Sequence, residues 1–156
     1  MESRTGELYH RDFYAWTRAQ AAKLRAGVLS GLDFENIAEE LESMGRAEKR
    51  QLGNRLSLII MHLLKMCVQA DKLPFYGNSW KATIREQRRR VEGLLRDNPS
   101  LRAALDEVFA EAYQDAVDEA IKETNLPESA FPGANPFSLG EVLDRDYWPT
   151  TPNPSQ

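Results

Sequence analysis

The sequence predicts an all-α protein, a bundle of four main helices with one long central helix and a C-terminal strap rich in proline and aromatic residues. Apolar residues recur at spacings of three and four in four long segments, which is the helical period. Residues typical of helix starts and stops flank these segments, and no segment alternates as a half-buried strand does. The length of 156 residues suits one domain. We therefore expect a single helical domain over residues 1–149 and a flexible tail over 150–156.

The first expected helix follows Asp12 and stops at Gly27. Aspartate is a favoured N-cap residue because its carboxylate accepts a hydrogen bond from the first turn. Apolar residues then continue at helical spacing from Phe13 to Leu24. Glycine is the usual residue just past a helix end, so Gly27 marks the stop.

The second expected helix is the longest and runs from about residue 34 to 69. Asp33 or a neighbour caps its start. At about 100° per residue, Phe34 and Leu41 stay in phase with Leu52 further along the chain. This phase agreement favours one long helix, straight or kinked, of roughly 54 Å. The alternative is a pair of helices that break at Gly45.

Two further helices are expected at residues 79–97 and 99–124, after a loop at 70–78. Ser79 can cap the third helix. Asn98 and Pro99 repeat the start signal, because proline suits the first helical position.

The segment after Leu126 is expected to be an ordered strap packed on the bundle, with a short turn of helix capped by Ser138. Aromatic residues in a helical bundle pack in the core far more often than they line a ligand site. Packing is therefore expected for Trp16, Trp80, Trp148, Phe131, Phe137 and Tyr147.

Several stretches of the chain together form a recognisable pattern. They are 12–16, 32–46, 62–65, Trp80 with 83–88, 99–101, 112–113, 123–124 with 126–127, 131–132 and 148–149. In this order they resemble a bacterial family catalogued as domain of unknown function number 29. The resemblance runs from about residue 9 to 149, and its most specific part is 36–46. The resemblance implies an all-helical domain and implies no activity.

Composition limits the chemistry open to this chain. Twenty Lys and Arg residues against 24 Asp and Glu give a net charge of −4, which argues against a general polyanion binder. The single cysteine and two histidines exclude an internal disulfide framework and a Cys-rich zinc site, so no cofactor is expected. No signal-peptide pattern opens the chain, and the apolar run at 56–64 is too short to span a bilayer. We expect a cytoplasmic protein without a membrane partner.

A candidate polar seam consists of Glu48, Arg55 and His62, which are seven residues apart on one edge of the long helix. Such a row can be a functional seam or a core network. The core network, or a histidine satisfied between helices, is favoured because buried polar groups must find partners.

Three carboxylates, Glu35, Glu39 and Glu42, line one flank of the same helix. Magnesium and other hard cations bind such oxygen clusters, so these residues are weak metal candidates. We commit to no metal, because a solvated acidic face near a helix N-terminus is the simpler interpretation.

The third helix carries the basic cluster of the chain. Trp80, Arg85, Arg88 and Arg89 form a candidate partner surface. This helix has a net charge of +3 and the fourth a net charge of −5. Neutralisation between the two antiparallel neighbours is therefore favoured over phosphate binding, and nucleic acid is not an expected partner.

The leading functional hypothesis is a non-catalytic interaction module that binds a protein partner or a second copy of itself. No glycine-rich phosphate loop, nucleophile elbow or zincin motif is present, so the balance leans against an enzyme. One alternative is a metal-assisted hydrolase that uses the glutamate cluster. Another is nucleic-acid binding through the arginine-rich third helix.

Overall fold

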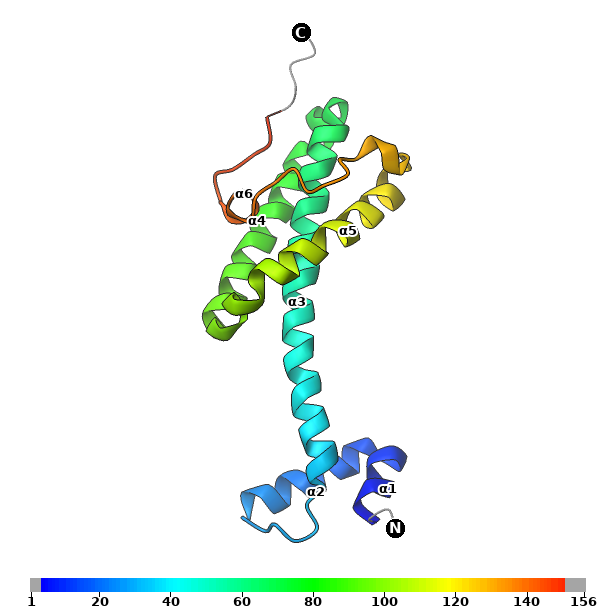
Figure 1. Ribbon diagram of the computed structural model, residues 1–156, viewed down its shortest axis with the longest axis vertical. Coiled ribbons are helices and arrows are strands. Elements are labelled where there is room, and N and C mark those ends of the chain that lie inside the picture. Colours follow the sequence, from blue (N-terminus) through cyan, green and yellow to red (C-terminus); the bar gives the residue numbers. More distant parts are fainter. Residues whose placement is uncertain (1–3, 151–156) are drawn as a thin grey trace. The chain divides into compact units, whose positions relative to one another are not determined.

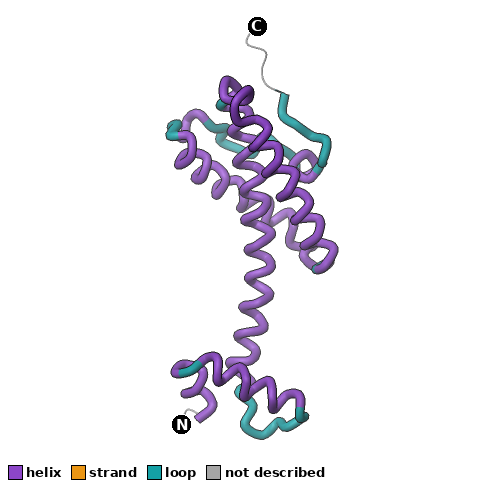
Figure 2. The backbone as a smooth tube through the Cα atoms, turned by 180° about the vertical axis from the view of Figure 1, so that it is seen from behind, coloured by secondary structure: helices purple, strands orange, loops and turns teal. Residues whose placement is uncertain are grey.

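A computed structural model describes residues 4–150, in which only helices, turns and loops occur (Figure 2). The helices are α1 (Arg4–Arg11), α2 (Phe13–Arg25), α3 (Phe34–Val68), α4 (Leu73–Asp97), α5 (Leu105–Thr124) and α6 (Leu139–Leu143) (Figure 1). Short 3-10 helices lie at η1 (Ala70–Lys72), η2 (Pro99–Ala104) and η3 (Glu128–Ala130). The predicted all-α class is confirmed. None of the helices in residues 4–150 combines the length and the apolar character needed to cross a bilayer.

The chain divides into two compact units, residues 1–48 and 49–156. Helix α3 contributes its first residues to the N-terminal unit and its remainder to the second unit. The expectation of a single domain over 1–149 stays a prediction. The expected tail lies outside the described residues except for Thr150.

In the N-terminal unit, the predicted helix after Asp12 is present as α2. The backbone N–H of Ala15 donates to Asp12 Oδ1 at 3.0 Å, which is the expected capping bond. Just past the helix end, Gly27 has a φ of +68°, a left-handed conformation that favours glycine. Helix α1 was not expected. It adds a hydrogen bond of 2.5 Å from the Tyr9 hydroxyl to Glu40 Oε1 of α3.

A polar centre around Asp33 connects α2 to the start of α3. Trp16 Nε1 donates to Asp33 Oδ2 at 3.0 Å, and Asn36 Nδ2 donates to the same oxygen at 2.8 Å. The Asp33 N–H donates to the buried Gln20 side chain at 2.9 Å. Burial raises the pKa of Asp33, but the bonds from Asn36 and Trp16 outweigh it and hold that pKa below its usual value. Asp33 thus organises this unit as an ionised acceptor.

Helix α3 continues through Gly45 and Gly53 as one helix, so the alternative with a break at Gly45 is not what the structure has. A glycine inside a helix costs about 1 kcal/mol relative to alanine, but it does not require a break. A Cβ on Gly53 would lie 3.4 Å from Cγ1 of Val108. The missing side chain therefore gives α5 close access to α3.

The core of the second unit is built from α3, α4, α5 and the strap (Figure 1). Of the four expected main helices, three meet in this core, whereas α2 belongs to the N-terminal unit. Its fully buried members include Leu52, Leu56, Ile59, Ile60, Leu63, Leu64, Ile84, Val91, Ala116, Ala120 and Val142.

The loop predicted at residues 70–78 is wrong, because η1 and the first turns of α4 occupy it. Pro74 lies in the first turn of α4, where proline removes no helical hydrogen bond. Tyr76 stacks on Trp80, four residues further, with ring centroids 6.1 Å apart. Gly77 is buried, and a Cβ there would lie 3.4 Å from a Leu73 methyl group. These contacts along one helix face extend α4 toward its N-terminus.

The fourth expected helix also begins differently from the prediction. Pro99 opens the 3-10 helix η2, and α5 begins only at Leu105. The Asn98 side chain donates to the Leu94 carbonyl at 3.2 Å and makes no N-cap bond. It therefore satisfies the end of α4 and not the start of the next helix.

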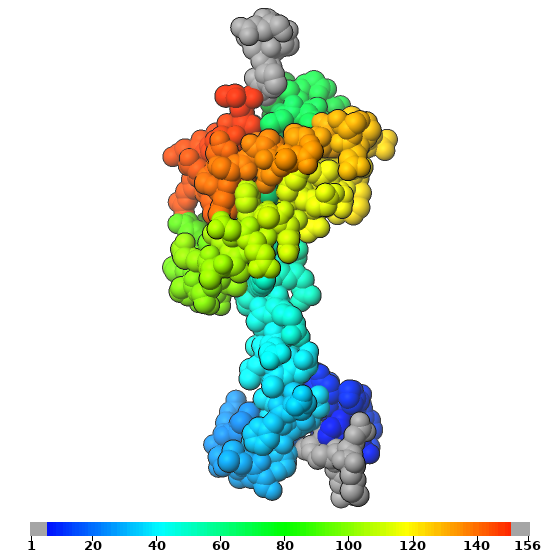
Figure 3. Space-filling view, in the orientation of Figure 1, coloured from blue at the N-terminus to red at the C-terminus, as the bar shows by residue number. Residues whose placement is uncertain are grey.

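The strap is present as predicted and lies across the surface of the second unit (Figure 3). Ser138 and Glu141 form a capping box, with the Glu141 N–H donating to Ser138 Oγ at 3.1 Å and the Ser138 N–H donating to Glu141 Oε2 at 2.9 Å. Phe131 and Phe137 are buried in the core, and Trp148 is half-buried.

Candidate functional site

The predicted polar seam separates into residues with different surroundings. Arg55 and His62 lie in the second unit, whereas Glu48 is the half-buried last residue of the N-terminal unit. Arg55 Nη1 donates to Gln87 Oε1 at 3.0 Å, a bond between α3 and α4. Arg55 Nε and His62 Nδ1 are buried without a hydrogen-bond partner among the described residues. Within residues 4–150, no hydrogen bond joins Arg55 to His62, and the seam stays a prediction.

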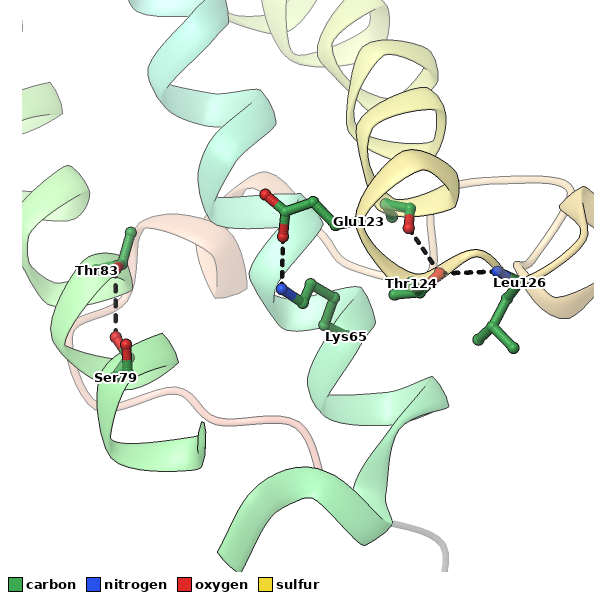
Figure 4. Close-up of polar contacts among 7 residues, drawn as sticks. Lys65, Ser79, Thr83, Glu123, Thr124 and Leu126 are labelled. Atoms are coloured by element: carbon green, nitrogen blue, oxygen red, sulfur yellow. Dashed lines mark hydrogen bonds and ion pairs between the residues drawn. The ribbon is translucent and has the colours of Figure 1, made fainter. Parts of the chain in front are cut away.

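His62 lies instead beside a buried lysine. Lys65 Nζ donates to Glu123 Oε2 of α5 at 2.6 Å (Figure 4) and lies 4.9 Å from the ring centroid of Trp80. Burial and, to a smaller extent, the Lys65 charge lower the pKa of His62 to about 4, against the opposing effect of Glu123. At neutral pH this cluster combines an uncharged imidazole with a paired ammonium group. The three-residue spacing of His62 and Lys65 could have indicated that they lie close together on one helix. Glu123 is 58 residues from Lys65, so no local sequence pattern could have placed it in this cluster.

The glutamates considered as metal ligands are exposed on α3. Glu39 Oε1 accepts a hydrogen bond of 2.8 Å from Arg46 Nη2, and Glu42 Oε2 lies 3.8 Å from Arg46 Nη1. Glu35 lies one turn before Glu39. Within the described part of the chain, no group of three or more His, Cys, Asp or Glu side chains could hold a metal ion.

The four residues of the candidate partner surface on α4 differ in how far they are buried. Trp80 and Arg88 are 7% and 2% exposed, so they offer little surface to a partner. Arg85 and Arg89 are exposed. The partner surface stays a prediction, and these two arginines are its accessible part.

Arg88 is the residue that holds the strap. Its Nε donates to the Val142 carbonyl at 2.8 Å, while Nη1 and Nη2 donate to the carbonyls of Tyr147 and Glu141 at 3.1 Å each. The guanidinium carbon also lies 5.1 Å from the ring centroid of Trp148. A planar group with five N–H donors can satisfy three carbonyls of an irregular segment at once.

The charges of α4 and α5 are compensated by other elements of the second unit and not by each other. None of the ion pairs in residues 4–150 joins these two helices. The acidic α5 pairs with α3, through Lys49 to Glu107 at 3.2 Å and Lys65 to Glu123 at 2.6 Å. On α4, Lys81, Arg85 and Arg88 lie near the Trp148 ring of the strap instead.

The N-terminal unit has apolar side chains that are exposed to solvent. Phe34, Leu41 and Met44 are 63%, 63% and 65% exposed, although Phe34 and Leu41 are in phase with the buried Leu52. The large exposed apolar side chains of this unit are Phe13, Tyr14, Leu24, Val28, Leu29, Phe34, Leu41 and Met44. Among its described residues, the buried apolar side chains are Trp16 and Leu32.

Fold and site together define an all-α protein with two helical units. One unit is well packed, and in the other most large apolar side chains are exposed to solvent. The chain belongs to the DUF29 family, described as a domain of unknown function, and the family model matches residues 8–148. The resemblance found in the sequence is thereby confirmed. No curated protein and no solved structure matches the chain.

Proposed function

We propose that the protein is a non-catalytic interaction module that associates with a second copy of itself through the apolar surface of its N-terminal unit. The observation that carries the proposal is the exposure of eight large apolar side chains among the first 48 residues. Large contiguous apolar patches are uncommon on monomeric proteins and mark interaction sites.

The pattern on α3 favours a helix as the partner. Phe34, Ile37, Leu41 and Met44 follow spacings of three, four and three, which is the repeat by which two helices pack side by side. Phe34, Leu41 and Met44 are more than half exposed, and Ile37 is half-buried. A second helix on this face would cover side chains that the chain itself leaves in water.

The charge distribution favours a second copy of the same unit. Helix α2 carries three basic residues, Arg18, Lys23 and Arg25, and no acidic ones. Residues 34–48 of α3 carry five glutamates and one arginine. In a two-fold arrangement, the basic helix of each copy can face the acidic helix of the other.

The two alternative functions have weaker support. Arg46 pairs with Glu39 and Glu42, which engages two of the three carboxylates that would have to bind a catalytic metal. Trp80 and Arg88 are buried, so they are not accessible to a nucleic acid on the arginine-rich helix.

Substitution of Leu41 and Met44 by serine tests the proposal on the full chain. We expect the wild type to be dimeric at high micromolar concentration, and the double variant to raise the dissociation constant at least tenfold. Each buried apolar anchor contributes on the order of 1–2 kcal/mol to an interface. Sedimentation equilibrium measures both constants, and because both side chains are exposed, the thermal midpoint of the monomer should stay unchanged.

The matched control is the double substitution Gln51→Ser and Asn54→Ser. It changes two exposed, uncharged residues of α3 that lie outside residues 34–48, so the net charge stays the same. This control should dimerise like the wild type. A wild-type chain that stays monomeric would overturn self-association, and so would a control that dissociates as far as the Leu41/Met44 variant.

A further inference from the structure

The second unit contains a cavity lined only by charged side chains, between α4 and the segment after α6. Its volume is about 300 Å³, and its lining residues are Arg85, Arg88, Arg89, Arg145 and Asp146. Three of the arginines come from one face of α4, and the other two residues come from the strap. Figure 1 shows α6 beside α4, where the strap closes this side of the unit.

The four guanidinium groups differ in how far they are already engaged. Arg88 is buried and committed to three strap carbonyls, so it forms a rigid wall. Arg145 pairs with Glu92. The guanidinium of Arg85 lies 5.2 Å from the ring centroid of Trp148. In the described part of the chain, neither Arg85 nor Arg89 has a carboxylate partner, so their N–H donors remain available at the cavity.

The charge of the cavity fits a dianion. Glu92 pairs with Arg145, and Asp144 acts on Arg88, so Arg85 and Arg89 supply the positive charge that is left for a ligand. Like charges that converge without a counter-charge repel each other, and a bound anion would remove this repulsion. Arginine forks match phosphate oxygens in geometry as well as in charge.

We propose that this cavity binds the phosphate group of a small phosphomonoester. A phosphomonoester carries a charge near −2 at neutral pH and three terminal oxygens, which suits the available donors of Arg85 and Arg89 on α4. A nucleic-acid backbone spreads its single negative charges along a groove. It would also meet a chain of net charge −4 whose α5 carries seven acidic residues. These charges favour one local phosphate group over a nucleic-acid backbone.

Calorimetric titration of the full chain with O-phosphoserine at low ionic strength tests this site. Wild type should bind, and Arg89→Gln should weaken binding about tenfold, the loss expected for one charge-assisted contact. Arg90→Gln is the matched control, because Arg90 is exposed on the same helix, pairs with Glu86 and does not line the cavity. It should change affinity less than about twofold.

The substitution Asp146→Asn supplies an independent readout. The Asp146 carboxylate opposes an anion at the cavity, whereas the backbone N–H of this residue makes the hydrogen bond to Asp144 that holds the turn. Asp146→Asn should therefore tighten phosphoserine binding by about two- to fivefold, while a site without a bound phosphate would not respond.

Three results would overturn the proposal. The first is no heat of binding for wild type with millimolar phosphoserine. The second is equal weakening by Arg89→Gln and Arg90→Gln, which would indicate general charge attraction. The third is tighter binding of a single-stranded oligodeoxynucleotide than of phosphoserine, which would make the surface a nucleic-acid site. Because Arg89, Arg90 and Asp146 are exposed, all variants should keep the wild-type melting temperature.

Discussion

Replacement of Arg88 by methionine is expected to lower the free energy of unfolding of the second unit by about 3 kcal/mol. Methionine fills much of the same space but donates no hydrogen bond. The carbonyls of Glu141, Val142 and Tyr147 would then lose their donors. Either they stay buried and unsatisfied, or the strap leaves the surface and uncovers the core beneath Val142. Chemical denaturation measures the loss, and limited proteolysis within residues 126–149 reports release of the strap.

Two further variants separate the hydrogen bonds of Arg88 from its charge. Arg88→Lys keeps the charge, but one ammonium group cannot reach three carbonyls in the positions that the guanidinium serves, so most of the stability should still be lost. Arg90→Met removes an exposed arginine from the same helix and breaks only a surface pair with Glu86, at a cost of about 0.5 kcal/mol or less. Full stability in Arg88→Lys, or equal losses in Arg88→Met and Arg90→Met, would contradict the structural role given to Arg88.

Local signals in the sequence were sufficient for much of the fold. Asp12 and Gly27 bound the first predicted helix, and Ser138 caps the short helix in the strap. Each of these residues acts within a few positions of itself, so its effect can be predicted without the rest of the chain. The early start of α4 was missed because Pro74 and Gly77 resemble loop residues. In the structure, their neighbours Leu73, Tyr76 and Trp80 pack along one helical face.

The periodicity of α3 was interpreted correctly as one long helix with an apolar face. A spacing of three and four shows that one face is apolar, but it does not show what covers that face. Leu52 is buried in the core of the second unit, whereas Phe34 and Leu41, in phase with it, are exposed. The exposed part is what supports the proposed association.

The arginine cluster also shows that a local sequence pattern does not reveal contacts with distant segments. Its charge was visible in the sequence, but the difference between Arg88 and Arg89 depends on segments more than fifty residues away. Arg88 faces the carbonyls of residues 141–147, while Arg89, one position further, is exposed at the cavity. Adjacent helical positions differ by about 100° in direction, so two neighbouring arginines can serve a structural and a binding role.

Acidification is expected to destabilise the second unit through His62. The pKa of this buried imidazole is about 4 in the folded chain, against an ordinary value of 6.5. Between these two values the unfolded chain takes up a proton that the folded chain does not. Stability is therefore complete above pH 6.5, falls as the pH decreases, and levels off below about pH 4. The expected loss is about 2 kcal/mol between pH 7 and pH 5, and on the order of 3 kcal/mol in full.

The substitution His62→Leu isolates this contribution. Leucine suits the buried site and cannot be protonated, so the variant should lose about 2 kcal/mol less than wild type between pH 7 and pH 5 in matched denaturation curves. Lys65 and Glu123, the charged groups that act on His62, stay in place in the variant, so any titration of Glu123 enters both curves. The exposed His10 provides the control, because His10→Gln should leave the pH dependence of wild type unchanged. Parallel curves for wild type and His62→Leu would show that the buried imidazole accepts its proton in the folded protein, and that the space around it is wetter or more mobile than its burial implies.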